Sequence, residues 1–170
     1  MSAHPLAEIM AETAPILLIG DSDSDRFPRA SHANYRKAGK AFEFYDLGKR
    51  DLTQHVDGKP VRRSLSELPE QWGGDLAVLW LHPASVPAGL EVAAGAGCKR
   101  VWFSFDTGSP GGIALAERLG MQVVEVGRCP VFYMSSRHGP CAIHGGVVQL
   151  TGLLDGAPRV AFQKGQRELL

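Results

Sequence analysis

Five apolar runs recur along most of the chain and predict the strands of a sheet. Residues 15–20 (PILLIG) and 75–83 (DLAVLWLHP) are nearly continuous apolar runs that close at a glycine and at a proline. The other runs lie at 41–48, 99–106 and 121–127. Continuous apolar strands are typical of a sheet that is covered on both faces, as parallel sheets are. The pattern therefore predicts five buried strands.

The stretches between these runs have the end signals of helices. Residues 29–39 finish at a glycine, residues 85–97 begin with a serine followed closely by a proline, and residues 109–120 begin with Ser-Pro. Strands that alternate with helices of this length indicate right-handed βαβ units. We predict the α/β class: a doubly wound, mainly parallel five-stranded sheet with helices on both faces.

The length of 170 residues fits one domain with short additions at its ends. We expect a leading helix or tail over residues 1–13, the α/β domain over 14–134, and a C-terminal extension over 135–170. Within the extension, the apolar run 145–154 and the segment 159–163 flank the turn signal DGAP. This pattern predicts a hairpin packed on the domain, or an extension that wraps over it.

Composition limits the partners that we expect. Hydrophobic residues make up 44% of the chain, charged residues 21%, and the formal net charge is zero. Without net charge there is no overall field to attract nucleic acid or an anionic membrane, so we expect neither. No apolar run approaches the roughly 20 residues that cross a bilayer, and residues 1–15 lack the pattern of a signal peptide. We therefore expect a cytoplasmic protein.

The turn after the first apolar run is the first candidate site. In a doubly wound sheet, ligands bind beyond the carboxyl ends of the strands, where backbone amides and a helix N-terminus hold phosphate. The turn reads GDSDSDRFPR, which contains neither GxGxxG nor a P-loop lysine. Gly20 stands where close approach of a ligand requires a glycine. The alternative is a solvated loop whose three aspartates cap the next helix.

Asp46, at the end of the second apolar run, is the second candidate. An acid at this place holds ribose hydroxyls in many dinucleotide sites. Lys49 and Arg50 follow closely and would instead meet a ribose-linked phosphate. The alternative is a turn acid with two surface bases.

Two cysteines and two histidines gather in the tail, at Cys129, His138, Cys141 and His144. They could satisfy tetrahedral zinc, but their spacing matches no zinc finger, and we assign no metal site. A second alternative is a reactive Cys141 whose pKa is lowered by a neighbouring histidine. No Ser-His-Asp pattern with a nucleophile elbow occurs, so no catalytic residue is assigned.

Five short segments, in order, carry a resemblance to a known family. They are IGDS (19–22), GKPVRRSLSELP (58–69), DLAVLWLHPASVP (75–87), GCKRVWFSFDT (97–107) and GMQVVEVGRCP (120–130). The set resembles the small stand-alone CoA-binding proteins, which are similar to the CoA-binding domain of the succinyl-CoA synthetase alpha subunit. The resemblance implies a Rossmann-like fold that binds coenzyme A, usually without a reaction of its own.

The resemblance also implies a binding site at the strand exits. The resemblance and the charges at the strand exits together lead us to expect these binding residues: Gly20, Asp21, Ser22, Arg26, Asp46, Lys49, His82, Pro83 and Thr107. Backbone groups of 20–22 would hold the diphosphate, and Arg26 or Lys49 would neutralise its charge. Residues 82–83 would wall the crevice, and Thr107 would contact the pantetheine arm.

Departures from the family pattern leave other ligands open. The family usually ends its second strand with Pro-Val-Asn-Pro, whereas residues 44–47 read FYDL, and an acid replaces the small residue at Asp21. Both acids disfavour a ligand with several phosphate charges, and Asp46 favours NAD over coenzyme A. The alternatives are an NAD(P)- or acyl-CoA-using enzyme on the same fold, and a degenerate member that acts through protein contacts, for example as a homodimer.

Overall fold

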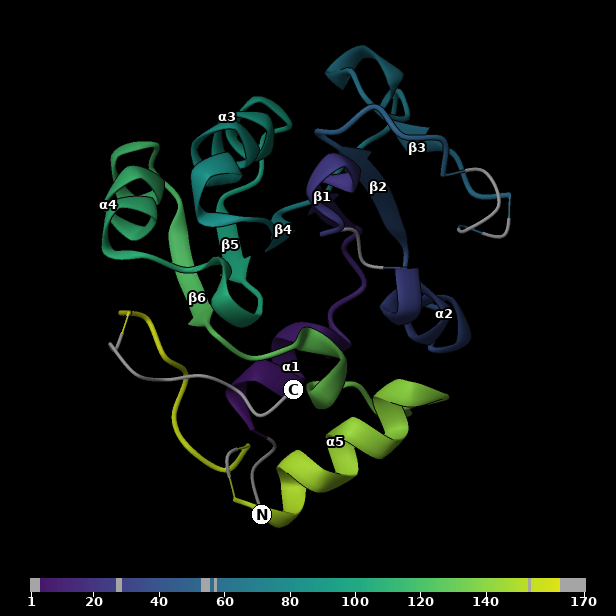
Figure 1. Cartoon of the computed structure of the whole chain (residues 1–170), viewed down its shortest axis with the longest axis vertical. Coiled ribbons are helices and arrows are strands. Elements are labelled where there is room, and N and C mark those ends of the chain that lie inside the picture. The colour runs from purple at the N-terminus through teal and green to yellow at the C-terminus, as the bar shows by residue number, and fades with distance from the viewer. Residues whose placement is uncertain (1–3, 27–28, 53–55, 57, 153, 163–170) are drawn as a thin grey trace.

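The centre of the molecule is a parallel six-stranded sheet (Figure 1), seen in a computed structural model that describes residues 4–26, 29–52, 56, 58–152 and 154–162. The strand order is β3-β2-β1-β4-β5-β6, so strands are added outward from β1 on one side and from β4 on the other, and this order reverses between β1 and β4. This is the order of a Rossmann-like doubly wound sheet, so the predicted α/β class is confirmed. The strands are β1 (Ile16–Gly20), β2 (Phe42–Asp46), β3 (Val61–Arg62), β4 (Leu76–Trp80), β5 (Arg100–Phe103) and β6 (Gln122–Val126).

The sixth strand, β3, was not predicted. It pairs with β2 at the sheet edge through the registers Phe44↔Val61 and Tyr45↔Arg62. Two residues are too few to show a period-two pattern, and both are only partly buried. The prediction of five strands therefore missed an element that tertiary pairing alone defines.

Helices cover both faces of the sheet (Figure 1). Helices α3 (Val86–Gly95) and α4 (Pro110–Arg118) pack on one face, while α1 (Pro5–Ala11), α2 (Arg29–Lys37) and α5 (Pro140–Leu150) pack on the other. The helices predicted within residues 29–39, 85–97 and 109–120 are confirmed as α2, α3 and α4.

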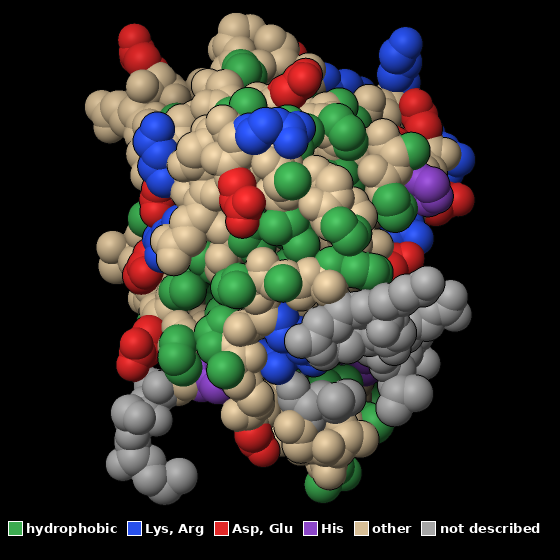
Figure 2. Space-filling view, turned by 90° about the vertical axis from the view of Figure 1, so that its left-hand side faces the viewer, with side chains coloured by type: hydrophobic (Ala, Val, Ile, Leu, Met, Phe, Trp, Pro, Cys, Tyr) green, Lys and Arg blue, Asp and Glu red, His purple; other side chains and the backbone are tan. Residues whose placement is uncertain are grey.

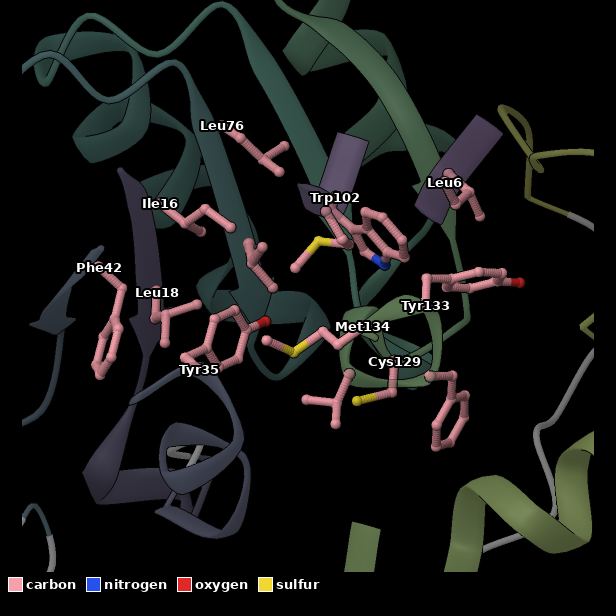
Figure 3. Packing of buried hydrophobic residues seen from close by; sticks show 14 of the residues in the cluster. Leu6, Ile16, Leu18, Tyr35, Phe42, Leu76, Trp102, Cys129, Tyr133 and Met134 are labelled. Carbon is pink, nitrogen blue, oxygen red and sulfur yellow. The ribbon is translucent and has the colours of Figure 1, made fainter. Parts of the chain in front are cut away.

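Each face of the sheet carries its own hydrophobic core. Along β1, Leu17 and Ile19 join the core under α3 and α4, whereas Ile16 and Leu18 join the opposite core. Successive side chains of a strand point to opposite faces, so a buried parallel strand must be apolar throughout. Figure 3 shows the second core, in which Trp102 is fully buried and its indole N–H donates to the carbonyl of Arg128 at 2.6 Å.

The C-terminal extension corrects the predicted hairpin, because its apolar run forms the helix α5. Pro140 occupies the first turn, where its missing amide hydrogen costs nothing. Cys141, Gly145 and Val148 follow at helical spacing and face the domain. The adjacent valines resembled a strand, but packing against α2 selects the helix. The described residues of segment 159–163 form no strand either.

After α5 the chain returns along the sheet edge and meets the N-terminal segment. The buried Arg128 donates to the hydroxyl of Tyr133 and to the carbonyl of Gly156, each at 3.0 Å. His4 Nε2 forms a 2.9 Å hydrogen bond with the same Gly156 carbonyl, and the His4 ring stacks on Tyr133. We call this arrangement the terminal clasp. The described part of the tail therefore contacts both the N-terminal segment and the domain.

The surface carries both signs of charge. On the face shown in Figure 2, acidic and basic side chains are interspersed among hydrophobic positions, without an extended area of one sign. None of the helices in the described part of the chain is both long and apolar enough to cross a membrane.

Candidate functional site

The predicted site residues gather at the edge formed by the carboxyl ends of β1, β2, β4 and β5. Gly20 of β1 and Trp80 of β4 lie opposite each other at this edge. The chain leaves β1 toward α2 and leaves β4 toward α3, on opposite faces of the sheet. In open α/β sheets, ligands bind at such a reversal, in the crevice outside the strand ends. We use the word crevice for this place at the β1 and β4 exits.

Asp21 spans this crevice. Its Oδ2 accepts a 3.0 Å hydrogen bond from Ser85 Oγ, in the turn after β4, and its Oδ1 accepts the amide hydrogen of Asp23 at 3.0 Å. The amide of Asp21 donates to the carbonyl of Arg26 at 2.7 Å. Two amides of the turn predicted to hold phosphate therefore already have partners within the chain.

Asp46 fastens the β1 turn to the β2 exit. Its Oδ1 accepts the amide hydrogens of Ser22 (2.8 Å) and Gly48 (3.0 Å), and its Oδ2 accepts the Ser22 hydroxyl (2.7 Å) and the Arg63 guanidinium (3.1 Å). A carboxylate has about four acceptor positions. The buried Asp46 fills them from its own chain, which leaves no position for a ribose hydroxyl.

Gly48 makes this fastening sterically feasible. A Cβ at this position would lie 2.4 Å from Ser22 Oγ and 2.6 Å from the amide nitrogen of Asp23. Only glycine allows the β2 exit to approach the β1 turn so closely.

The cations of the site are partly engaged by acids. Arg26 forms a two-point ion pair with Asp106, beyond β5, and this hydrogen bonding raises the pKa of Arg26 and holds the pKa of Asp106 below its usual value. Asp106 remains 61% exposed, so a stronger anion can compete for Arg26. Lys49 is exposed beside the β2 exit, and its amide donates to Asp23 Oδ1 at 3.1 Å.

The remaining predicted residues differ in exposure. His82 and Pro83 follow β4 and are exposed, with His82 Nδ1 accepting the amide hydrogen of Ala84. Thr107 is fully buried, and its Oγ1 accepts the amide hydrogen of Leu81 at 3.0 Å. His82 and Pro83 therefore lie exposed beside the β4 exit, whereas Thr107 is buried beneath it and holds the amide of Leu81.

An apolar cavity of about 190 Å³ lies beside the crevice, on the face covered by α2 and α5. Leu18, Val78 and Trp80 form its floor, and Phe132 and Cys141 close it from above. No Asp, Glu, Lys or Arg is among its lining residues. A cavity of this kind suits an uncharged group.

Phe105 lines the same cavity with an unusual backbone. Its φ of 52° lies in the left-handed region, which costs a non-glycine residue roughly 1–2 kcal/mol. Its ring lies between Trp80, 5.6 Å away between centroids, and the parallel ring of His144, 6.5 Å away. Backbone strain that packing maintains is concentrated at functional sites.

The sequence left two alternatives open for the cysteines and histidines of the tail, a zinc site and a reactive thiol. Among the described residues, no group of three or more His, Cys, Asp or Glu side chains is arranged to hold a metal ion. Burial raises the pKa of the Cys141 thiol, and a hydrogen bond with the Asn34 side chain only partly opposes this rise. The alternative of a Cys141 whose pKa is lowered by a neighbouring histidine is therefore not supported.

Strand order, crevice and helix placement together define a Rossmann-like α/β protein. The family model described as a CoA binding domain matches residues 15–135, and the chain belongs to this family. The resemblance inferred from the sequence is confirmed. No curated protein shows significant sequence similarity to the chain.

Several solved structures share the fold. A hypothetical protein from Pyrococcus horikoshii OT3 is 21% identical, with a TM-score of 0.61 and coverage of 75% of this chain and 86% of its own. A conserved hypothetical protein from Pyrococcus furiosus is 21% identical (TM-score 0.55; 69% and 97% covered). A Thermus thermophilus protein is 18% identical (TM-score 0.58; 78% and 96% covered). At these identities the similarity supports the fold alone.

Sequence reasoning missed Arg63, Gly48, Ser85 and Phe105. Arg63 and Ser85 reach the site only through tertiary contacts, with Asp46 and Asp21 respectively. Gly48 gave a signal, since a glycine soon after a strand indicates close backbone approach. The left-handed backbone of Phe105 has no sequence signal.

Proposed function

We propose that this protein binds coenzyme A or an acyl-CoA at the carboxyl ends of β1, β4 and β5, without a reaction of its own. The observation that carries the proposal is the match of residues 15–135 to the CoA binding domain. The crevice at the β1/β4 reversal supports it, because it lies where the fold class takes its ligands. A cytoplasmic location stays a prediction.

The phosphates of the ligand would meet the crevice where Gly20 permits close approach. Arg26 would exchange the exposed carboxylate of Asp106 for a phosphate, and Lys49 would supply a second positive charge. His82 and Pro83 would wall the crevice. Because the Ser22 and Asp23 amides already donate to carboxylates, phosphate would reach them only by displacing bonds within the chain.

The NAD(P) alternative has less support. It relied on Asp46 as the ribose ligand, and the carboxylate of Asp46 is occupied by Ser22, Gly48 and Arg63.

A thermal-shift experiment with coenzyme A, acetyl-CoA, NAD and NADP tests the proposal. A ligand at 100 times its Kd stabilises the folded state by about 2.7 kcal/mol. For a chain of this size we expect a rise in Tm of about 5–10 °C with the two CoA compounds. A rise with NAD or NADP alone would overturn the choice of ligand.

A second candidate function is a degenerate member that acts through protein contacts. Two observations favour it: the carboxylates of Asp21 and Asp46 already fill the anion-binding turn, and α5 exposes an apolar stripe. Ile143, Val147 and Leu150 share one side of α5 and are 75%, 50% and 90% exposed. No Tm change with any of the four compounds would favour this candidate.

A further inference from the structure

The cavity beside the crevice offers the means to distinguish between CoA compounds. Its floor comes from the carboxyl-end halves of β1 and β4, and Ser104 and Phe105 at the β5 exit complete its wall. These same strand ends also border the crevice. The reactive end of a ligand held in the crevice would therefore lie within reach of the cavity. This step rests on the proposed function.

The size of the cavity limits what it can hold. An engineered apolar cavity of about 150 Å³ in another protein stays dry and binds benzene. The cavity here measures about 190 Å³. It therefore suits a group of about four to six carbon atoms.

The chemistry of the walls restricts the group further. Leu18, Val78 and Phe132 present hydrocarbon. The polar lining residues are Ser31, Tyr35, Ser104 and His144, and none of them carries a permanent positive charge. Burying a carboxylate without a partner is strongly unfavourable. An acyl group that ends in a carboxylate would therefore be rejected, whereas a straight hydrocarbon chain would be accepted.

We propose that this cavity is an acyl pocket, and that the protein prefers acyl-CoA with an uncharged chain of about four to six carbons over free coenzyme A and over dicarboxylic acyl-CoA. The left-handed backbone of Phe105 places its ring between Trp80 and His144, where it forms one wall of the pocket.

Isothermal titration with coenzyme A, acetyl-, butyryl-, hexanoyl- and succinyl-CoA tests the inference. From acetyl to butyryl we expect the Kd to fall about fourfold for each added methylene, which corresponds to about 0.8 kcal/mol. Succinyl-CoA has the same number of acyl carbons as butyryl-CoA, and we expect it to bind about tenfold or more weakly.

A matched pair of variants locates the effect. Cys141→Phe fills the pocket and should erase the ratio between the Kd values of acetyl- and butyryl-CoA. Ala142→Phe places the same ring on the exposed side of α5 and should keep that ratio. Circular dichroism and Tm establish that both variants fold. If Cys141→Phe does not fold, the chain-length series on the unmodified protein still decides.

The outcomes separate this inference from the proposed function. Equal Kd values for coenzyme A and butyryl-CoA, with both binding, would overturn the acyl pocket and leave CoA binding intact. Tight binding of succinyl-CoA would also overturn it. An absence of binding by all five compounds would overturn both proposals.

Discussion

Two aspartates at the strand exits determine how the site is organised at the scale of single residues. Asp21 connects the turn after β1 to Ser85, and Asp46 connects it to the β2 exit. The sequence identifies both acids as site residues, because they directly follow apolar strands. Their partners could not be predicted, since Ser85 and Arg63 reach them only after the sheet has formed. The roles of both aspartates therefore depend on contacts that no local motif encodes.

Removing the charge of Asp21 tests its effect on a phosphorylated ligand. A unit negative charge near a phosphate costs about 1 kcal/mol in water-like surroundings. We expect Asp21→Asn to lower the Kd for coenzyme A about fivefold, measured by titration calorimetry. Asp155→Asn, an exposed position in the tail, is the control and should leave the Kd unchanged. Weaker binding by Asp21→Asn would mean that the carboxylate itself helps to form the site.

At the scale of elements, the apolar runs identify five strands and the end signals identify three helices. Ser109 illustrates why this works, since its hydroxyl accepts the amide hydrogen of Gly112 at 3.1 Å and begins α4 as its sequence predicts. The predicted cap Ser85 makes no side-chain cap hydrogen bond in α3, because its hydroxyl donates to Asp21. The same reasoning fails for helix α5, which the sequence predicts as a hairpin. Its valine pair is typical of strands, and the burial of Val148 against the domain is a tertiary effect. The element that closes the cavity therefore owes its helical form to tertiary packing.

The exposed stripe of α5 gives an element-scale prediction for self-association. Helix α5 contains no charged residue, so two copies could meet along Ile143, Val147 and Leu150 without like charges opposing each other. If the second candidate function holds, we expect concentration-dependent dimers in analytical ultracentrifugation. Leu150→Lys should raise the dimer Kd about tenfold or more, because a buried leucine contributes about 1.5–3 kcal/mol.

Leu119→Lys, at the end of α4, is the control for this experiment, since Leu119 is a partly exposed leucine on another helix. It should leave association unchanged. A protein that stays monomeric at every concentration tested would exclude the α5 dimer.

At the scale of the whole molecule, the alternation of strands and helices is enough to predict a doubly wound sheet. The terminal clasp is beyond such reasoning, because Arg128 reaches Gly156 and His4 meets Tyr133 across long sequence separations. Arg128 also lies 3.5 Å from Glu125, and both side chains are buried. Burial dominates at Glu125 and raises its pKa despite the neighbouring arginine. The clasp thus concentrates buried polar groups at one edge of the sheet.

Breaking this clasp should destabilise the whole fold. Arg128→Met removes the hydrogen bonds to Tyr133 and Gly156 and the arginine that pairs with the buried Glu125. We expect a loss of about 3–5 kcal/mol in the free energy of unfolding, measured by urea denaturation. Adding Glu125→Gln should recover part of this loss, because the uncompensated charge disappears. Arg118→Met, on the exposed end of α4, should change stability by no more than about 0.5 kcal/mol. A loss of that small size in Arg128→Met would contradict the role of the clasp.

The four-donor arrangement around Asp46 has a consequence for how a ligand would enter the site. Its carboxylate takes the place of an external anion at the turn, because it accepts hydrogen bonds from Ser22, Gly48 and Arg63. If the proposed site binds a phosphate compound, the phosphate must compete with these contacts within the chain. We then expect the compound to exchange readily with its free pool, unlike a permanently bound prosthetic group.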